Sequence, residues 1–87
     1  MNIRERVRQF VVENFYVSDP SEIGDDTLLV TTGIVDSTGM LEVIGFLETE
    51  FGIRIDDRET TPENLETIER MAAFVERKRQ AGGGKTG

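Results

Sequence analysis

Apolar residues recur every three or four positions in three stretches of the chain, the spacing that gives an α-helix one apolar face. The first stretch follows Asn2, a residue type favoured just before a helix, and carries Glu5 three positions later. We expect an amphipathic helix of about four turns here. Its apolar positions are Ile3, Val7, Phe10, Val11 and Phe15.

The other two stretches predict two further helices. One covers about residues 37–51 and is followed by Gly52, a residue type suited to a helix C-cap. The other covers about residues 65–78 and ends in basic residues, which suit the C-terminal end of a helix dipole. Their apolar stripes are Met40, Val43, Ile44, Leu47 and Phe51, and Leu65, Ile68, Met71, Ala72 and Val75.

The segments between these helices lack a sustained period. Residues 17–36 contain Pro20, Gly24 and Gly33 and predict a long ordered loop. Four apolar side chains of this loop should fold back on the core, whereas Val35, just before Asp36, looks exposed. The four are Ile23, Leu28, Leu29 and Ile34. Thr61 before Pro62 predicts a short helix of about one turn. The predicted fold class is all-α: a small four-helix bundle of three long helices and one short one, with a long loop between the first two.

Composition narrows the possible functions. The 87 residues suffice for one domain, and they contain neither an apolar run long enough to cross a bilayer nor a signal peptide at the N-terminus. We therefore expect a soluble, cytoplasmic protein that is a monomer. The chain has no cysteine and no histidine, which removes disulfides, thiolate catalysis and the usual general base of serine hydrolases. An enzyme would have to work with scattered carboxylates alone.

The net charge is −7, and the acidic residues are concentrated in the middle of the chain. Residues 13–69 hold fifteen acidic side chains but only two basic ones, Arg54 and Arg58. A region this acidic repels nucleic-acid backbones and suits a protein partner with a basic surface. Alternatively, these acidic residues bind no partner and only make the protein soluble.

Candidates for two known motifs, a phosphate-binding loop and an EF-hand loop, do not match on closer inspection. The tail AGGGKTG resembles the end of a phosphate-binding loop, but Arg79 stands where the first glycine is required. We expect one domain over residues 1–79 and a flexible tail over residues 80–87. An EF-hand loop starting at Asp19 would need glutamate where Val30 stands, and one starting at Asp56 meets Arg58 at its third position. We therefore predict no metal site.

Asp36 and Ser37 lie where the second helical pattern begins. Both are residue types that cap helices, so a purely structural role is possible. A serine hydroxyl at this place also points toward solvent, beside free backbone amides and the positive end of the helix dipole, which favour a phosphate group. The position therefore suits a phosphoester.

The run GIVDSTGMLEVIGFLETEFGIRI around this pair resembles the signature of acyl carrier proteins and of the related peptidyl and aminoacyl carriers. The features that match are a glycine, two mostly apolar residues, Asp-Ser, and an amphipathic helix ending in Leu-Glu-x-x-Phe-x-Ile-x-Ile. The similarity continues into Asp26-Thr27-Leu28-Leu29 before it and Asn64-Leu65-Glu66-Thr67-Ile68 after it. It covers essentially residues 3–78.

The resemblance implies a non-enzymatic carrier. In that family the serine, here Ser37, receives 4′-phosphopantetheine from coenzyme A through a phosphopantetheinyl transferase, and the thiol of the arm holds an acyl or aminoacyl group as a thioester. Asp36 matches the aspartate that helps to orient the serine and the metal ion of the transferase. Partner enzymes, such as an acyl- or aminoacyl-activating ligase with a basic patch, would meet the second helix at Leu41, Glu42, Glu48 and Glu50. The core could also loosen to admit a short acyl chain.

Two positions depart from the fatty-acid carriers. Thr38, followed by Gly39, stands where those carriers usually have leucine, and Gly45 stands where they often have a bulky apolar side chain. Both changes reduce the apolar surface near the serine and indicate a specialised biosynthetic pathway. The alternative function is an acidic helical adaptor that binds a basic protein without a prosthetic group.

Overall fold

The computed structural model describes residues 2–15, 17 and 19–80, and the secondary structure of this part is entirely helical. Its α-helices are α1 (Ile3–Asn14), α2 (Ser37–Phe51), α3 (Pro62–Leu65) and α4 (Ile68–Lys78). Two short 3-10 helices, Pro20–Glu22 and Asp57–Glu59, lie in the connections. The predicted all-α bundle with one short helix is therefore confirmed. The expected tail stays a prediction, since residues 81–87 lie outside the described part.

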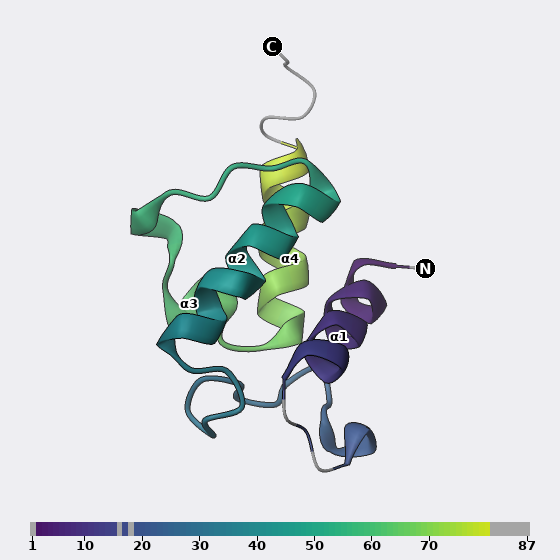
Figure 1. The fold of residues 1–87 in the computed structure, drawn as a ribbon. Coiled ribbons are helices and arrows are strands. Elements are labelled where there is room, and N and C mark those ends of the chain that lie inside the picture. The colour runs from purple at the N-terminus through teal and green to yellow at the C-terminus, as the bar shows by residue number, and fades with distance from the viewer. Residues whose placement is uncertain (1, 16, 18, 81–87) are drawn as a thin grey trace.

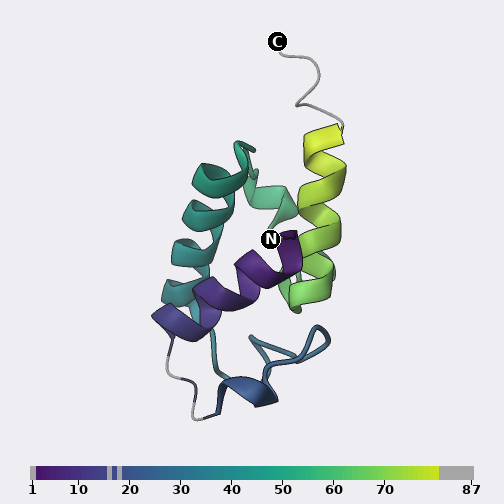
Figure 2. The ribbon, with the colours of Figure 1, turned by 90° about the vertical axis from the view of Figure 1, so that its right-hand side faces the viewer.

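The helices form a small bundle with the long loop at one end. α2 and α4 lie on opposite sides of the bundle in Figure 2, and α1 crosses obliquely between them. The connection from α1 to α2 covers the end of the bundle where α2 begins, whereas the connection from α2 to α3 runs across the opposite end (Figure 1). None of the helices described here is long and apolar enough to span a membrane.

Local sequence signals explain most helix ends. The Asn2 side chain accepts a hydrogen bond of 2.8 Å from the N–H of Glu5, as its N-cap position predicts. Gly52 adopts the left-handed conformation with φ of 67°, which confirms the predicted C-cap. α1 has 12 residues, a little over three turns rather than four.

The predicted start of the last helix at residue 65 is wrong. Leu65 ends α3, and α4 begins at Ile68 because Thr67 takes an extended conformation and accepts a hydrogen bond of 3.0 Å from the N–H of Arg70. Thr61 precedes α3 with Pro62 at the first helical position, as predicted.

The apolar stripes meet in one core. Its fully buried members include Val7 and Val11 from α1, Val43 and Leu47 from α2, and Ile68, Met71 and Val75 from α4. Each of these positions was assigned to an apolar stripe. Met40, Ile44 and Phe51 are partly buried at the edge of the core, as are Phe10 and Phe15.

The long loop is ordered over its described residues, but two of its side chains lie opposite to expectation. Leu28 is 43% exposed, whereas Val35 is completely buried. Ile23 and Leu29 are buried and Ile34 is partly buried, as predicted. The Leu29 N–H donates to the carbonyl of Glu66, far along the chain, and the Val35 N–H donates to the carbonyl of Leu29, so the backbone is fixed at both buried residues.

Candidate functional site

Ser37 is the first residue of α2, and its side chain is exposed. Its neighbour Asp36 is the N-cap: one carboxylate oxygen, Oδ1, accepts a hydrogen bond of 2.7 Å from the N–H of Gly39. No hydrogen bond joins the Ser37 hydroxyl to another described residue. The hydroxyl is therefore exposed and makes no hydrogen bond to the described chain, while the capping role is filled by Asp36.

The Asp36-Ser37 pair is held in place by a turn and a buried residue before it and by close helix packing after it. On one side, Gly33 turns the chain with φ of 84°, a conformation that favours glycine, and the completely buried Val35 anchors it to the core. On the other side, α2 packs so closely on the end of α1 that a Cβ at Gly39 would lie 2.5 Å from Cε1 of Phe15. A larger residue at position 39 would therefore force the Phe15 ring to shift.

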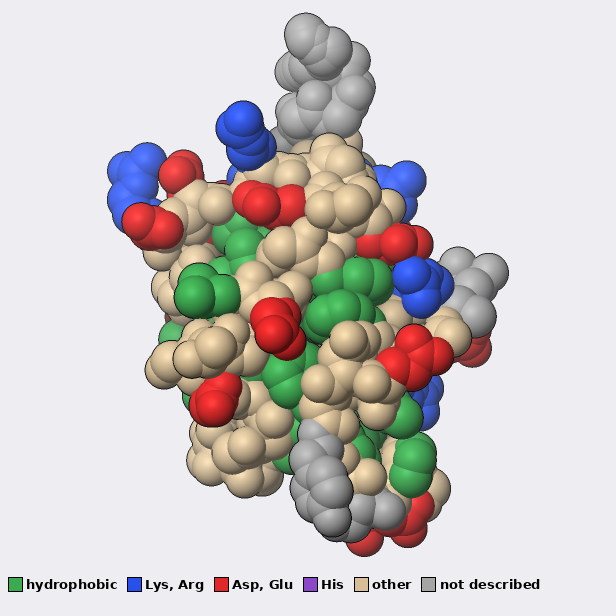
Figure 3. All heavy atoms as spheres, in the orientation of Figure 1, with side chains coloured by type: hydrophobic (Ala, Val, Ile, Leu, Met, Phe, Trp, Pro, Cys, Tyr) green, Lys and Arg blue, Asp and Glu red, His purple; other side chains and the backbone are tan. Residues whose placement is uncertain are grey.

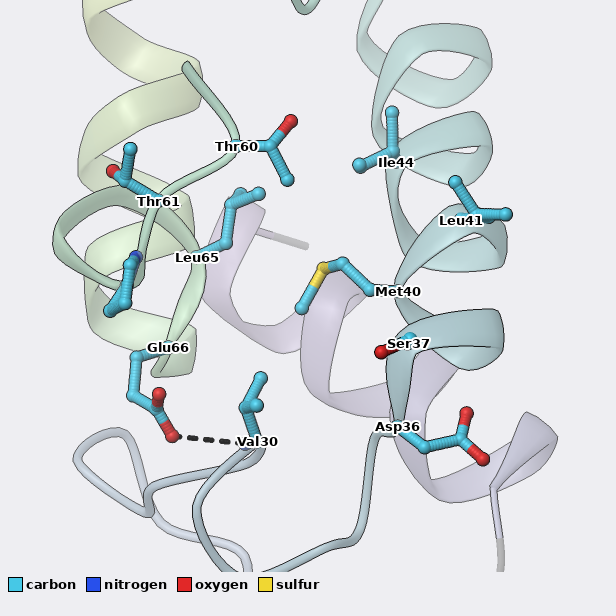
Figure 4. Close-up of a pocket in the computed structure, with 11 residues that line it drawn as sticks. Val30, Asp36, Ser37, Met40, Leu41, Ile44, Thr60, Thr61, Leu65 and Glu66 are labelled. Carbon is cyan, nitrogen blue, oxygen red and sulfur yellow. Dashed lines mark hydrogen bonds between the residues drawn. The ribbon is translucent and has the colours of Figure 1, made fainter. Parts of the chain in front are cut away.

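A groove opens beside Ser37, between α2 and the segment that leads into α3 (Figure 4). Its volume is about 290 Å³. Met40 and Ile44 line it from α2, and Leu65 lines it from the opposite side. Leu41 and Val30 also line it and are 71% and 43% exposed. The surface around the serine is therefore mainly apolar.

A buried carboxylate forms part of the same groove. Glu66 is only 6% exposed, and its Oε2 accepts hydrogen bonds of 2.9 Å from the N–H groups of Val30 and Thr31. These bonds fasten the long loop to the junction between α3 and α4. Sequence reasoning missed this residue, because nothing in a single glutamate after Leu65 signals that its side chain turns inward.

The expected partner surface is only partly free. Leu41 and Glu42 are exposed in the first half of α2, and Leu41 lies one turn from Ser37. Glu48 is half-buried and accepts a hydrogen bond of 2.9 Å from the N–H of Ile55. Glu50 makes an ion pair with Arg6 of α1.

The Arg6–Glu50 pair has two contacts. Arg6 Nε donates to Oε2 of Glu50 at 3.0 Å, and Arg6 Nη2 lies 3.0 Å from Oε1. The hydrogen bond from Arg6 holds the pKa of Glu50 below its ordinary value. The Arg6 guanidinium also lies 5.3 Å from the ring centre of Phe46, which stacks on Phe10. This end of α2 is therefore engaged with α1.

Acidic side chains lie over α2 on the face shown in Figure 3, and lysine and arginine side chains lie towards its margins. Within the part of the chain that the structure describes, no three acidic side chains come together as a candidate metal site. The acidity of this face is therefore distributed rather than gathered at one point.

Comparison with family models and comparison with individual curated proteins give different results. No family model matches the chain. Curated relatives do: a protein of Campylobacter hominis is 33% identical over 76 residues, which are 87% of this chain and 92% of its own. A protein of Buchnera aphidicola is 30% identical over 77 residues, which are 88% of this chain and 92% of the relative. A protein of Solidesulfovibrio magneticus is 28% identical over 79 residues, which are 91% of this chain and 97% of the relative. All three are named acyl carrier protein.

Proposed function

Because this chain belongs to the acyl carrier protein family, we propose that it carries an acyl or aminoacyl group as a thioester on 4′-phosphopantetheine attached to Ser37. The observation that supports this most strongly is the exposed hydroxyl at the first position of α2, free of hydrogen bonds to the rest of the described chain. A carrier presents its cargo to separate enzymes, so the protein itself performs no catalytic step.

The residues at this position fit a phosphopantetheine group. The phosphodiester would lie at the N-terminus of a 15-residue helix, where the amides of the first turn and the helix dipole favour a negative charge. The groove beside Ser37 gives the far end of the arm an apolar surface to rest on. When bound, the group supplies the thiol that the cysteine-free chain lacks.

Asp36 has two proposed tasks. Its Oδ1 caps α2 through Gly39, which fixes the backbone on which Ser37 is presented. Its second oxygen makes no hydrogen bond to the described chain and can face the metal ion of the transferase. Asp36→Asn separates these tasks, because asparagine is an equally good N-cap but carries no charge. We expect unchanged stability and a loading rate lower by about tenfold or more.

The attachment site is tested by intact mass. Wild type is incubated with coenzyme A and a broad-specificity phosphopantetheinyl transferase, in parallel with Ser37→Ala and Ser21→Ala. Ser21 is the matched control, since it is an exposed serine in the 3-10 helix Pro20–Glu22 whose hydroxyl donates to Asp19. We expect wild type and Ser21→Ala to gain one phosphopantetheine and Ser37→Ala to gain none. A wild type that gains nothing from several transferases would favour the acidic adaptor.

We further propose that the carrier serves a specialised pathway with its own ligase. Thr38 and Gly45 are both exposed on α2, and a Cβ at Gly45 would have nothing within 4 Å. The partner therefore meets less apolar surface here than a bulky side chain would give. Thioester formation by candidate adenylating ligases, compared with transfer by fatty-acid synthase enzymes, tests this. Acceptance by the fatty-acid enzymes alone would refute it.

A further inference from the structure

Glu66 is a buried carboxylate with one unused oxygen. The side chain is almost wholly withdrawn from solvent, a situation that charged residues tolerate when they are paired. Oε2 accepts both hydrogen bonds from the long loop. Oε1 receives none from any described residue, although a carboxylate can accept about four.

This carboxylate lines the groove that begins at Ser37. Figure 4 shows it at the foot of the groove, beside the Val30 side chain, with one oxygen joined to Val30 by a hydrogen bond. Among the described residues, the lining includes two acidic residues, Asp36 and Glu66, and no lysine or arginine. A group that enters the groove therefore meets apolar walls and the carboxylate of Glu66, whereas the Asp36 carboxylate points away from the groove (Figure 4).

We propose that Glu66 accepts a hydrogen bond from an amine on the cargo, so that the carried group is a short aminoacyl group. The inference rests on the proposed attachment of the arm at Ser37. A protonated amine would make a charge-assisted hydrogen bond to Oε1, which is stronger than a neutral one. A plain hydrocarbon would instead cover this oxygen without replacing its lost water, which is unfavourable.

The size of the groove limits the cargo. A volume of about 290 Å³ lies at the lower end of the range for ligand pockets. It therefore has room for a short chain, and the amine is expected near the end of that chain. Met40 and Leu65 would contact its methylene groups, since they face the groove from opposite sides (Figure 4).

The test uses three amide-linked cargoes of equal length on the pantetheine arm, which resist hydrolysis and cyclisation. They are pentanoyl, 4-aminobutanoyl and 4-hydroxybutanoyl, so that only the terminal group changes from methyl to ammonium to hydroxyl. In wild type we expect the amine cargo to raise the melting temperature by roughly 4 °C or more over the methyl cargo. We also expect it to give the largest NMR shifts at the amides of Val30 and Thr31, which report on Glu66.

Two variants identify the residue responsible. Glu66→Gln removes the charge but keeps an oxygen that can accept from Val30 and Thr31, and it should lose most of the amine effect. Glu63→Gln removes an exposed charge from neighbouring α3 and should retain it. If Glu66→Gln fails to fold, the comparison of the three cargoes on wild type still decides the question.

Several results would overturn the inference. They are a methyl cargo that stabilises wild type as much as the amine, equal responses to hydroxyl and amine, or an amine effect that persists in Glu66→Gln. Intact mass is measured first on every sample. Absence of the adduct on wild type would refute the proposed function, whereas a loaded protein indifferent to the amine would refute only the role of Glu66.

Discussion

Replacing Gly45 by alanine should stabilise the protein, whereas the same replacement at Gly39, in the same helix, should destabilise it. Both glycines lie in α2, and neither has a positive φ. In each case alanine removes the cost of glycine in a helix, about 0.5–1 kcal/mol. The two variants differ in what the new methyl group would meet.

At Gly45 the added Cβ would contact nothing within 4 Å, so the full gain in helix stability should remain. For a domain of this size, about 0.5–1 kcal/mol corresponds to an increase in melting temperature of roughly 2–8 °C. At Gly39 the Cβ would lie 2.5 Å from Cε1 of Phe15 and 3.2 Å from Oδ1 of Asp36. Overpacking of this kind costs about 1–3 kcal/mol. Since Asp36 also caps the helix, we expect a net loss of about 1 kcal/mol.

The assay is urea unfolding of both variants and wild type in one buffer, followed by circular dichroism, with a check that the slope of the transition is unchanged. Phe15→Ala provides the control background. There the obstacle to a methyl group at position 39 is gone, so Gly39→Ala should become neutral or stabilising relative to Phe15→Ala alone. Equal shifts of Gly39→Ala and Gly45→Ala in the wild-type background would refute the steric reasoning.

Three further predictions concern stability. Asp36→Ala should lower the free energy of unfolding by about 1 kcal/mol, measured by urea unfolding, because it removes the cap on the Gly39 N–H. Hydrogen bonds from the Asp56 N–H and from Lys78 hold the pKa of Glu59 below its ordinary value of 4.5. The stabilisation is therefore complete above pH 4.5 and is lost as the pH falls through the folded-state pKa, so Glu59→Gln should show a smaller loss of stability in acid than wild type. Finally, added salt should raise the melting temperature by screening the repulsion within a chain of net charge −7, and a melting temperature indifferent to salt would contradict this.

Short-range signals predicted the helices well and the loop less well. The capping residue Asp36 and the glycine at 52 define α2 at both ends, and the structure places it at Ser37–Phe51 as expected. The start of α4 was predicted too early because Leu65 and Ile68 both fit the apolar stripe, and only the extended backbone at Thr67 separates them.

The inward and outward positions of the loop go together with backbone hydrogen bonds, one to Glu66 far along the chain and one within the loop. Leu28 and Leu29 are adjacent leucines with the same hydrophobicity, yet only Leu29 is buried, and its N–H donates a hydrogen bond to the carbonyl of Glu66. Val35 is also buried, and its N–H donates to the carbonyl of Leu29 within the same loop. Periodicity carries no information about such contacts, so both the misassigned loop residues and the buried carboxylate of Glu66 lay beyond sequence reasoning.

The glutamates of α2 are another case in which residues that look equivalent in the sequence have different contacts in the structure. The sequence presents Glu42, Glu48 and Glu50 as equivalent residues off the apolar stripe, and their part in partner binding stays a prediction. In the structure two of them have internal partners: Glu48 holds the chain after Gly52 through the Ile55 N–H, and Glu50 pairs with Arg6. A basic partner would have to compete with these contacts for Glu48 and Glu50. Glu42 needs no such rearrangement, so the first half of α2, beside Ser37 and the exposed Leu41, is where charge attraction is most readily available.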